Sequence, residues 1–344
     1  MKHTRHRHGR SRRRKVLIRA VWMTAAALVI VLAAIITLRI LSPEAPVQEV
    51  YGDLDTRFLS SVRLERNGET YSYREYAIEN VLIIGVDQDT PPEGKSVYRS
   101  GGQADFLLLV SLDRENRTIT PVQLDRDTIT PINILGIMGN PAGTRTTHLC
   151  LAQAYGKNLR DQSRNTEKAV SRLLKGVIID HYVTVDLTAI NLINDALGGV
   201  TVTIDEDLSY LDPAFVKGAT VRLQGSQAET FVRSRMGVRS DPTNAGRMRR
   251  QRTYMQAAVN LLMDRIRSDS SYALRVLDQL GEHVTTDIPQ GWLTNELSMY
   301  ADFPVMSFYT PAGEHRLDEE GFMAFYPDAD ALVDNLIRMY FRRT

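Results

Sequence analysis

The sequence of 344 residues contains a single cysteine, Cys150, so no disulfide bond can form within the chain. Domains without disulfides must bury a sufficient core, and a chain of this length can do so. Glycine-rich phosphate loops, cysteine and histidine pairs at zinc-binding spacing, and the G-x-S-x-G nucleophile motif are also missing. These absences exclude a small disulfide-stabilised domain and argue against P-loop, zinc and serine-hydrolase chemistry.

The chain also lacks a large net charge, with 42 basic and 41 acidic side chains, but these charges are unevenly distributed. Residues 1–19 carry nine lysines and arginines and no acid, and residues 20–38 carry no charge at all. About 20 apolar residues are enough to cross a bilayer as a helix. We predict a basic cytoplasmic tail at 1–19 and a single-pass signal anchor at 20–41, which places the rest of the chain outside the cell membrane.

Two other interpretations of the N-terminal region are less favoured. A cleaved signal peptide usually has an apolar region of only about 7–15 residues. A basic tail can also bind nucleic acid, but here it adjoins the apolar span. Beyond residue 39, 32 basic side chains are outnumbered by 41 acidic ones, so the outer part of the chain is acidic. We therefore expect a membrane-anchored protein without a nucleic-acid partner.

The remainder predicts a polar stalk and lead-in at 42–79, followed by one α/β domain at 80–344. Apolar runs predict strands at 80–87, 104–113, 118–125, 180–187, 200–205 and 304–310. Apolar residues at helical spacing predict helices at 147–156, 165–176, 188–199, 225–232, 247–268 and 328–341. We expect Asn165 or Thr166 to cap the second of these helices.

Two aspartates lie at the edges of predicted strands, Asp87 after the first and Asp105 at the start of the second. Ligands of open α/β sheets gather at such strand ends. If the strands are neighbours, the two carboxylates meet, and Mg²⁺ favours such a pair together with substrate phosphate. The alternative is that each aspartate only caps a turn. Arg126 follows the third strand between Asp125 and Asp127, either as a surface ion pair or as an arginine directed into the same cleft.

The stretch 231–252 holds seven arginines and one acid, a local exception in an acidic domain. Arg233 and Arg235 would lie about 200° apart in a helix, but they share a face if the chain is extended. Arg247, Arg250 and Gln251 have the spacing of one helical face. Arginine at a helix N-terminus is favourable when an anion binds there, and arginine binds phosphate bidentately. The cluster therefore predicts a phosphate or pyrophosphate site.

Other side chains near these positions are not expected to take part. Arg249 and Arg252 fall on the opposite side of the predicted helix, where we expect a solvated face. His148 and Cys150 lie two residues apart and point in opposing directions in a helix, so a cysteine–histidine nucleophile is not expected. His181 lies within a predicted strand and is expected to be structural.

The ordered set of motifs NVLIIGVD, ADFLLLVSLD, VQLDRDT, DHYVTVDL, DALGGVTVTI, VRSR and GRMRRQ resembles the LytR–CpsA–Psr family of bacterial cell-wall enzymes. The resemblance implies a three-layer α/β/α sandwich around a mixed central sheet. It also implies transfer of a teichoic acid or capsular polysaccharide from undecaprenyl pyrophosphate to peptidoglycan. Its site residues fall on Asp87, Asp105 and Arg126 for catalysis, with Mg²⁺, or Mn²⁺ in its place, on the two aspartates. The pyrophosphate contacts fall on Arg126, Arg233, Arg235, Arg247 and Gln251.

The chain departs from the family pattern at three places. Gln103 stands where an arginine is frequent, Asp125 replaces a common proline, and His148-Leu149-Cys150 replaces a frequent Lys-Ile-Asn. These departures leave two alternatives open beside the transferase: a non-catalytic module that binds polyprenyl pyrophosphate, and a transcription attenuator of the cell envelope. The short basic tail offers little for the attenuator, since it is too short for a DNA-binding fold. For the transferase, Asp87 and Asp105 are the candidate general bases.

Overall fold

The computed structural model describes residues 47–49, 63–74, 76–87, 102–136, 138–234 and 244–344. All described residues belong to one compact unit, Val47–Thr344. The predicted tail and membrane anchor therefore lie outside the described residues, as does Arg235. Among the residues described, no helix has both the length and the apolar character needed to cross a membrane.

A five-stranded mixed sheet forms the centre of the described unit. Its order is β12 (Val284–Thr286), β9 (His181–Val185), β4 (Ile78–Val86), β5 (Ala104–Asp113) and β6 (Thr118–Leu124). β4 and β9 are parallel, whereas the β12–β9, β4–β5 and β5–β6 pairs are antiparallel. The predicted α/β class with a mixed central sheet is confirmed. β4 and β5 read as continuous apolar runs because both faces of the sheet are covered.

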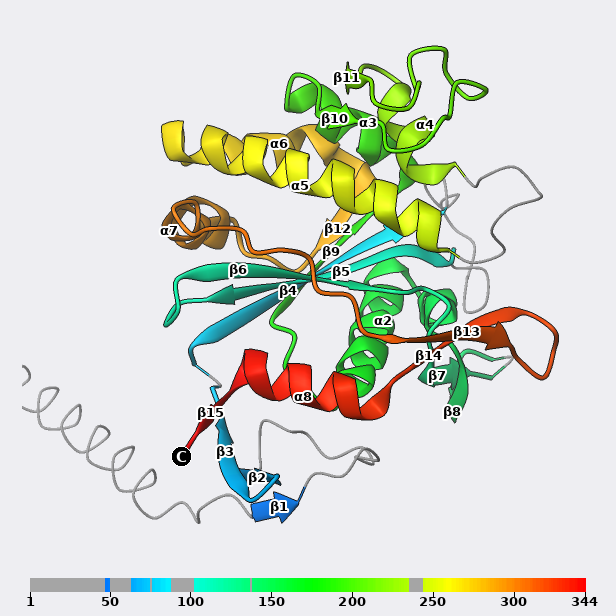
Figure 1. The fold of residues 1–344 in the computed structure, drawn as a ribbon, viewed down its shortest axis with the longest axis vertical. Helices are drawn as coiled ribbons and strands as arrows, with labels where there is room; N and C mark the ends of the chain where they lie inside the picture. The colour runs from blue at the N-terminus through cyan, green and yellow to red at the C-terminus, as the bar shows by residue number, and fades with distance from the viewer. Residues whose placement is uncertain (1–46, 50–62, 75, 88–101, 137, 235–243) are drawn as a thin grey trace, which may run out of the picture. The chain divides into compact units, whose positions relative to one another are not determined.

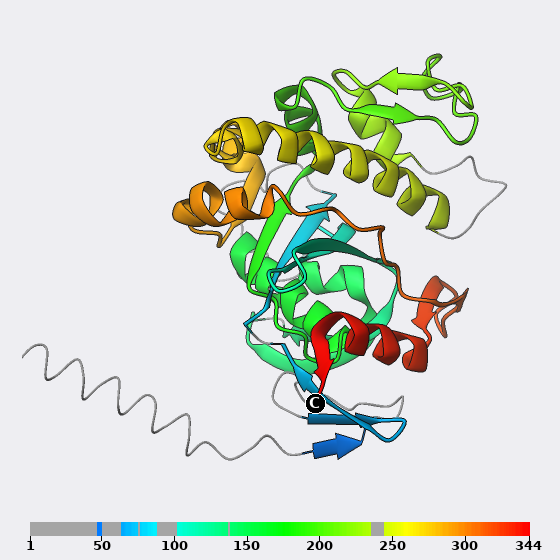
Figure 2. The same cartoon turned by 60° about the vertical axis from the view of Figure 1, so that its left-hand side comes forward.

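Helices cover the sheet on both faces and make three layers (Figures 1 and 2). One face carries α3 (Leu187–Ala196), α5 (Ala245–Ser268), α6 (Tyr272–Leu280) and α7 (Leu297–Tyr300). A π-helical turn at Trp292–Glu296 directly precedes α7. The other face carries α2 (Leu159–Leu173) and α8 (Ala329–Tyr340). Side chains alternate between faces along a strand. Leu82 of β4 accordingly lies in the core under α2 and α8, while its neighbours Val81 and Ile83 line a pocket under α5.

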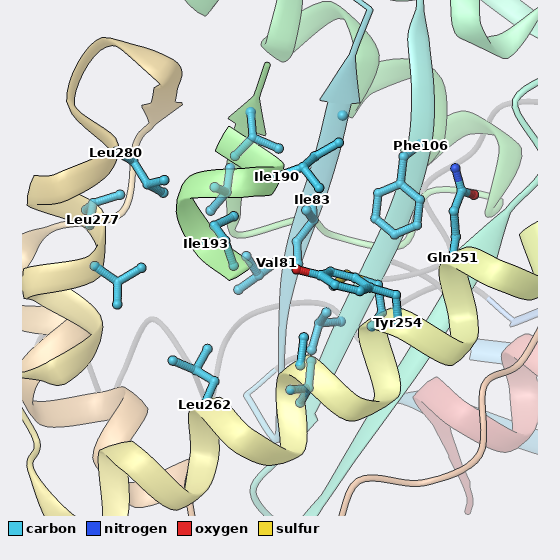
Figure 3. A pocket seen from close by; sticks show the side chains of 18 of the residues that line it. Val81, Ile83, Phe106, Ile190, Ile193, Gln251, Tyr254, Leu262, Leu277 and Leu280 are labelled. Carbon is cyan, nitrogen blue, oxygen red and sulfur yellow. The ribbon is translucent and has the colours of Figure 1, made fainter. Parts of the chain in front are cut away.

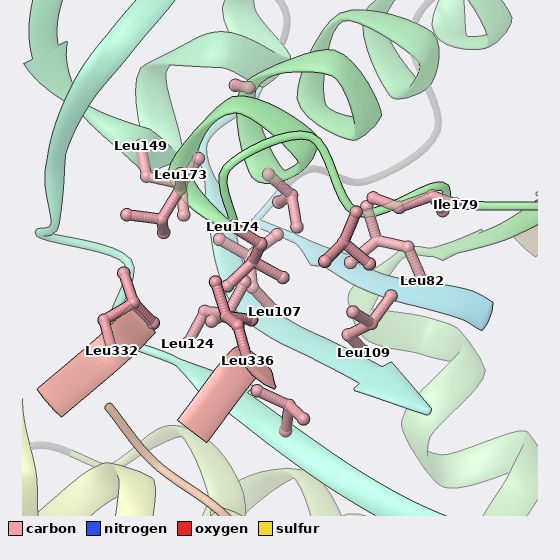
Figure 4. Close-up of a cluster of buried hydrophobic side chains, with 14 of the residues drawn as sticks. Leu82, Leu107, Leu109, Leu124, Leu149, Leu173, Leu174, Ile179, Leu332 and Leu336 are labelled. Atoms are coloured by element: carbon pink, nitrogen blue, oxygen red, sulfur yellow. The ribbon is translucent and has the colours of Figure 1, made fainter. Parts of the chain in front are cut away.

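The largest apolar core lies between the sheet and the α2–α8 layer (Figure 4). Leucines of both helices and of the central strands meet there, namely Leu82, Leu107, Leu109, Leu173, Leu174, Leu332 and Leu336. All of them are buried, and burying one such side chain contributes about 1.5–3 kcal/mol. This layer therefore provides a rigid base for the opposite face of the sheet.

Smaller sheets and hairpins surround the central sheet. β1 (Val47–Glu49), β2 (Arg63–Arg66), β3 (Glu69–Tyr73) and the C-terminal β15 (Phe341–Arg343) form a four-stranded sheet. Antiparallel pairs join β7 (Ile129–Leu135) to β8 (Pro141–His148), β10 (Thr201–Thr203) to β11 (Thr220–Arg222), and β13 (Gly313–Leu317) to β14 (Met323–Pro327). The short α4 (Gln227–Arg233) precedes α5.

Three predicted elements were wrong in extent or type. α2 begins at Leu159, where the Asn158 side chain accepts a hydrogen bond from the Asp161 N–H, rather than near residue 165. The predicted helix at 147–156 is the end of β8 followed by a 3-10 helix, Leu149–Ala154. The predicted strand at 304–310 makes only isolated bridges to β6, at Val305 and Tyr309.

Candidate active site

The two predicted aspartates lie at one edge of the central sheet. The β4–β5 ladder shifts register between Gly85 and Val86, and the Asp87 N–H donates to the Gln103 carbonyl at 3.2 Å. Bulges of this kind end strand pairing and redirect side chains beside active sites. Asp87 and Asp105 therefore leave neighbouring strands at the same edge, as their positions in the sequence predicted.

Asp105 lies between two arginines from different elements. Arg126, in the turn after β6, contacts Asp105 Oδ1 through Nη1. Arg247, in the first turn of α5, places Nη1 3.5 Å from Asp105 Oδ2, and its Nε donates to Asn244 Oδ1 at 2.7 Å. Both arginines are buried. Two fixed guanidinium groups thus lie together at a strand end, and guanidinium groups are the side chains best suited to bind an anion such as phosphate.

Asp87 is paired with Arg233, the last residue of α4. Arg233 Nη2 lies 3.1 Å from Asp87 Oδ1, and its Nη1 lies 2.7 Å from Glu229 Oε1. Both Arg233 and Asp87 are nearly half exposed, so this ion pair stabilises the fold little and can exchange for a ligand. Arg233 is the last helical residue of α4, and the relation of Arg233 to Arg235 that the sequence left open lies outside the described residues.

Gln251 and Arg247 lie near each other on α5, but Arg250 does not share their surroundings. Gln251 is buried and accepts a hydrogen bond from Gln123 Nε2 at 3.3 Å. The Arg250 side chain is only 1% exposed, donates from Nε to the Phe231 carbonyl at 3.0 Å and contacts Glu206. Arg250 shares the helical spacing of Arg247 and Gln251 but not their contacts, because Glu206 and the backbone carbonyls of Phe231 and Ser234 bind its guanidinium.

The two arginines expected on a solvated face behave differently. Arg249 is about half exposed and pairs with Asp205 at 2.5 Å and Glu206 at 3.2 Å, as expected for that face. Arg252 is only partly exposed and donates to Gln123 Oε1 at 2.9 Å, so its predicted solvent position was wrong. Burial, together with the nearby Arg249, lowers the pKa of Arg252 from its ordinary value.

Positions that depart from the family pattern surround Arg126. The Gln103 side-chain oxygen accepts a hydrogen bond from Arg126 Nη2, and Cys150 Sγ lies 3.4 Å from the same nitrogen. Burial raises the pKa of the Cys150 thiol to about 11, with Arg126 partly opposing this shift. The thiol is therefore protonated near neutral pH, which agrees with the expectation that no cysteine nucleophile acts here.

A pocket of about 360 Å³ has Arg233 and Arg247 in its lining. It extends between the sheet and α5 (Figure 3). Its few charged or amide lining residues are Asp105, Asp186, Arg233, Arg247 and Gln251. Asp186 follows β9, which is parallel to β4, so all five lie toward the same sheet edge. The rest of the lining is apolar and includes Val81, Ile83, Phe106, Ile190, Ile193, Tyr254, Leu262, Leu277 and Leu280.

The carboxylates at this edge suit a magnesium ion in their chemistry. Mg²⁺ takes one or two protein carboxylates, keeps several waters and completes its ligand set with substrate phosphate oxygens. Asp87 and Asp105 supply two such carboxylates next to the arginines. In the part of the chain that the structure describes, no group of three or more His, Cys, Asp or Glu side chains could hold a metal alone. This donor set fits an ion that arrives with a phosphate ligand.

Sequence reasoning missed several residues of this site. Asn244 orients Arg247, and Gln123 contacts both Gln251 and Arg252, but neither amide has a recognisable motif. For the pocket lining, the sequence did contain a signal, namely apolar residues at helical spacing. Met255, Ala258 and Leu262 are apolar residues at helical spacing within the predicted helix 247–268, and all three line the pocket. What the pattern could not show is that this face borders a cavity rather than a filled core.

Comparisons with known proteins identify the family of this chain and agree with its fold. The LytR_cpsA_psr family model matches residues 60–330. Over 254 residues the chain is 29% identical to the polyisoprenyl-teichoic acid–peptidoglycan teichoic acid transferase TagU of Bacillus mycoides, covering 73% of this chain and 74% of that protein. The fold is similar to the crystal structure of Bacillus subtilis TagV, with a TM-score of 0.58 and 21% identity over 76% of this chain and 97% of that one. It is also similar to TagT bound to LI-WTA, with a TM-score of 0.57 and 19% identity over 77% and 90% of the two chains.

Proposed function

Because this chain belongs to the LytR_cpsA_psr family, we propose that it transfers a glycopolymer from a polyprenyl pyrophosphate carrier to peptidoglycan. The observation that carries the proposal is the junction of a cationic cluster with an apolar pocket. Arg233 and Arg247 line the same cavity as Val81, Leu262 and Leu277. A pyrophosphate attached to a polyprenyl chain is a ligand with these two parts. The relatives named as teichoic acid transferases support the same class of substrate.

In this proposal the ligand divides between the two parts of the site. The polyprenyl chain enters the apolar pocket, where burial of its surface stabilises the complex by about 25 cal/mol per Å². Its pyrophosphate binds at the sheet edge, where Arg126, Arg233 and Arg247 surround two carboxylates. The glycan remains in solvent, beyond Asp87 and Arg233, which are the more exposed of these side chains. Arg235 and the membrane anchor, which lie outside the described residues, belong to the proposal on sequence grounds.

The proposed reaction is a displacement at the phosphorus that carries the glycan. A peptidoglycan hydroxyl forms a new P–O bond, the P–O bond to the second phosphate breaks, and polyprenyl monophosphate leaves. Asp87 and Asp105 are the carboxylates at this edge that can receive the hydroxyl proton. Arg126 and Arg247 are already fixed, so they stabilise the developing charge without rearranging. When bound to Asp87 and Asp105, Mg²⁺ would add positive charge next to the pyrophosphate.

The test is transfer of a short glycan from a polyprenyl pyrophosphate to peptidoglycan oligomers by the full chain, with and without Mg²⁺. We expect Arg126→Ala and Arg233→Ala to lower the rate, Arg126→Ala by roughly 100-fold because it removes a preorganised donor. We expect chelation of the metal to abolish transfer. Arg249→Ala is the control, since it removes an equal charge from the solvent side of α5 and is expected to leave the rate unchanged.

Tight binding of the donor without turnover, indifferent to Mg²⁺ and to both variants, would contradict the proposal. That outcome would favour the non-catalytic binding module.

A further inference from the structure

Arg126 lies in a short turn between two aspartates that hold its backbone and side chain. Asp125 Oδ1 accepts a hydrogen bond from the Asp127 N–H at 3.0 Å, and the Asp125 carbonyl accepts one from Thr128 Oγ1 at 2.6 Å. Asp127 Oδ1 lies 3.2 Å from Arg126 Nε. With Nε held on that side, both terminal nitrogens are directed to Asp105 and Gln103. The geometry of this turn therefore decides where the Arg126 guanidinium lies in the site.

The β13–β14 hairpin packs directly on this turn. The Phe325 N–H of β14 donates to the Asp127 carbonyl at 2.9 Å, and Phe325 forms a parallel bridge with Thr128. His315 of β13 places Nε2 2.9 Å from Asp125 Oδ2. The Asp125 side chain is only 2% exposed, so it depends on this partner and on the turn for its hydrogen bonds.

A second histidine links the hairpin to the other aspartate. His148 Nε2 lies 3.0 Å from Asp318 Oδ2, and its Nδ1 lies 3.7 Å from Asp127 Oδ1. Asp318 is itself fixed, because its Oδ1 accepts the N–H groups of Glu320 and Phe322. The contact with His148 and these backbone bonds lower the pKa of Asp318. An ionised Asp318 thus orients His148 beside the carboxylate that holds Arg126.

These contacts reach Arg126 from both sides, and each connects it to the hairpin. If the carboxylates of Asp125 and Asp127 were free to move, they would draw Arg126 away from the site. When the hairpin holds them, the N–H groups of Arg126 stay in place. Such positioning matters because a displacement of 1 Å can cost roughly 100-fold in rate. Two of the departures from the family pattern near Arg126, Asp125 and His148, contact the hairpin through their side chains.

We propose that the β13–β14 hairpin sets the position of Arg126 for pyrophosphate binding, with His315 and Asp318 as positioning residues. This role rests on the proposed function, since it acts through an arginine that binds the donor pyrophosphate.

The test is a double-mutant cycle between His315 and Arg126, read as the affinity of the full chain for geranylgeranyl pyrophosphate. We expect His315→Ala to weaken binding roughly tenfold, less than a full 1 Å displacement can cost in rate. In the Arg126→Ala background the same change is expected to have no further effect, because its target is gone. His315→Gln should retain near-normal affinity, since its amide nitrogen can reach Asp125 from a similar position.

A matched pair extends the test to the second contact. Asp318→Asn keeps an oxygen for the turn but loses the charge that orients His148, so weaker binding is expected. Glu319→Gln makes the same charge change on an exposed neighbour and is expected to bind normally. Thermal midpoints for all variants show whether each one is folded at the temperature of measurement.

The outcomes separate the hairpin from the function that it serves. If Arg126→Ala weakens binding while His315→Ala does not, or weakens it equally in both backgrounds, the positioning role is overturned and the proposed function stands. If Arg126→Ala binds the probe as tightly as the unmodified chain, the proposed pyrophosphate site fails, and the role of the hairpin fails with it.

Discussion

Arginine side chains that lie close together in this chain have different roles, and the groups that contact each guanidinium determine its role. Arg126 and Arg247 are buried against Asp105 and line up at the sheet edge. Arg250 is also buried, but Glu206 and two backbone carbonyls surround its guanidinium. Guanidinium groups satisfied in this way are structural. Arg126 and Arg247 instead share the carboxylate of Asp105 at the strand ends, where the proposed function places the pyrophosphate.

Arg250→Ala is therefore expected to destabilise the protein by about 3–5 kcal/mol, because it leaves Glu206 without its buried partner. Arg249→Ala removes the other arginine that contacts Glu206, but from an exposed position, and should cost less than about 1 kcal/mol. Denaturant unfolding of the two variants checks the difference. Equal losses of stability would contradict the structural role given to Arg250.

Sequence spacing could not separate Arg247 from Arg250. The two are three residues apart on one helix, and they lie on overlapping faces. What distinguishes them is Glu206, a residue about forty positions earlier in the chain that the fold brings to one side of α5. The positions of Asp87 and Asp105 were easier to predict, because both follow from the ends of two long apolar strands.

At the level of elements, the β5–β6 turn is fastened to the chain after β3 by a buried ion pair. Asp113 contacts Arg74 through two hydrogen bonds of 2.8 Å, and both side chains are buried. Burial alone would raise the pKa of Asp113, but the bonds from Arg74 and Asn116 outweigh it and lower the pKa below its ordinary value. The ionised form is therefore the one that the fold stabilises.

Asp113→Asn is expected to lower the free energy of unfolding by about 3 kcal/mol at neutral pH, since Arg74 loses its main partner. A carboxylate with a lowered folded-state pKa contributes stability above about pH 4, and this contribution is lost as the pH falls further. The variant should thus differ from the unmodified chain at pH 7 and converge with it in acid. Asp330→Asn, in an exposed pair with Arg66, is the control with little expected effect.

If the difference in unfolding free energy between Asp113→Asn and the unmodified chain persists undiminished at acid pH, the ion-pair account is contradicted. Stability curves at several pH values, measured by denaturant unfolding, provide the comparison.

Helix α2 shows why the beginning of an element escaped prediction. Its buried face includes the polar residues Gln162, Ser163, Asn165 and Thr166. Several of these bond to other elements, as Ser163 does to Thr184 and Thr166 does to Gln153. Apolar spacing predicted this helix only from residue 165 and missed residues 159–164, because hydrogen bonds replace apolar contacts on the buried side. The β13–β14 hairpin was missed because much of it is exposed and polar.

At the scale of the whole described unit, one face of the sheet carries the largest apolar core, and the other carries a smaller core and the apolar pocket. The α2–α8 layer packs closely on the sheet, whereas the α3, α5 and α6 layer leaves the apolar pocket (Figures 3 and 4). The cationic cluster lies where this pocket reaches the strand ends. A ligand with a long apolar part and a compact anionic end matches both features at once, which is the basis of the proposed function.

The most direct measurement follows a phosphorus label through the reaction. The donor is a polyprenyl pyrophosphate–glycan whose glycan-linked phosphate carries ³²P, and the full chain is incubated with it, peptidoglycan oligomers and Mg²⁺. Displacement at that phosphorus predicts that the label moves into peptidoglycan with the glycan, while unlabelled polyprenyl monophosphate is released. Glycan transfer that leaves the label on the lipid, or no transfer at all, would contradict the proposed phosphotransferase.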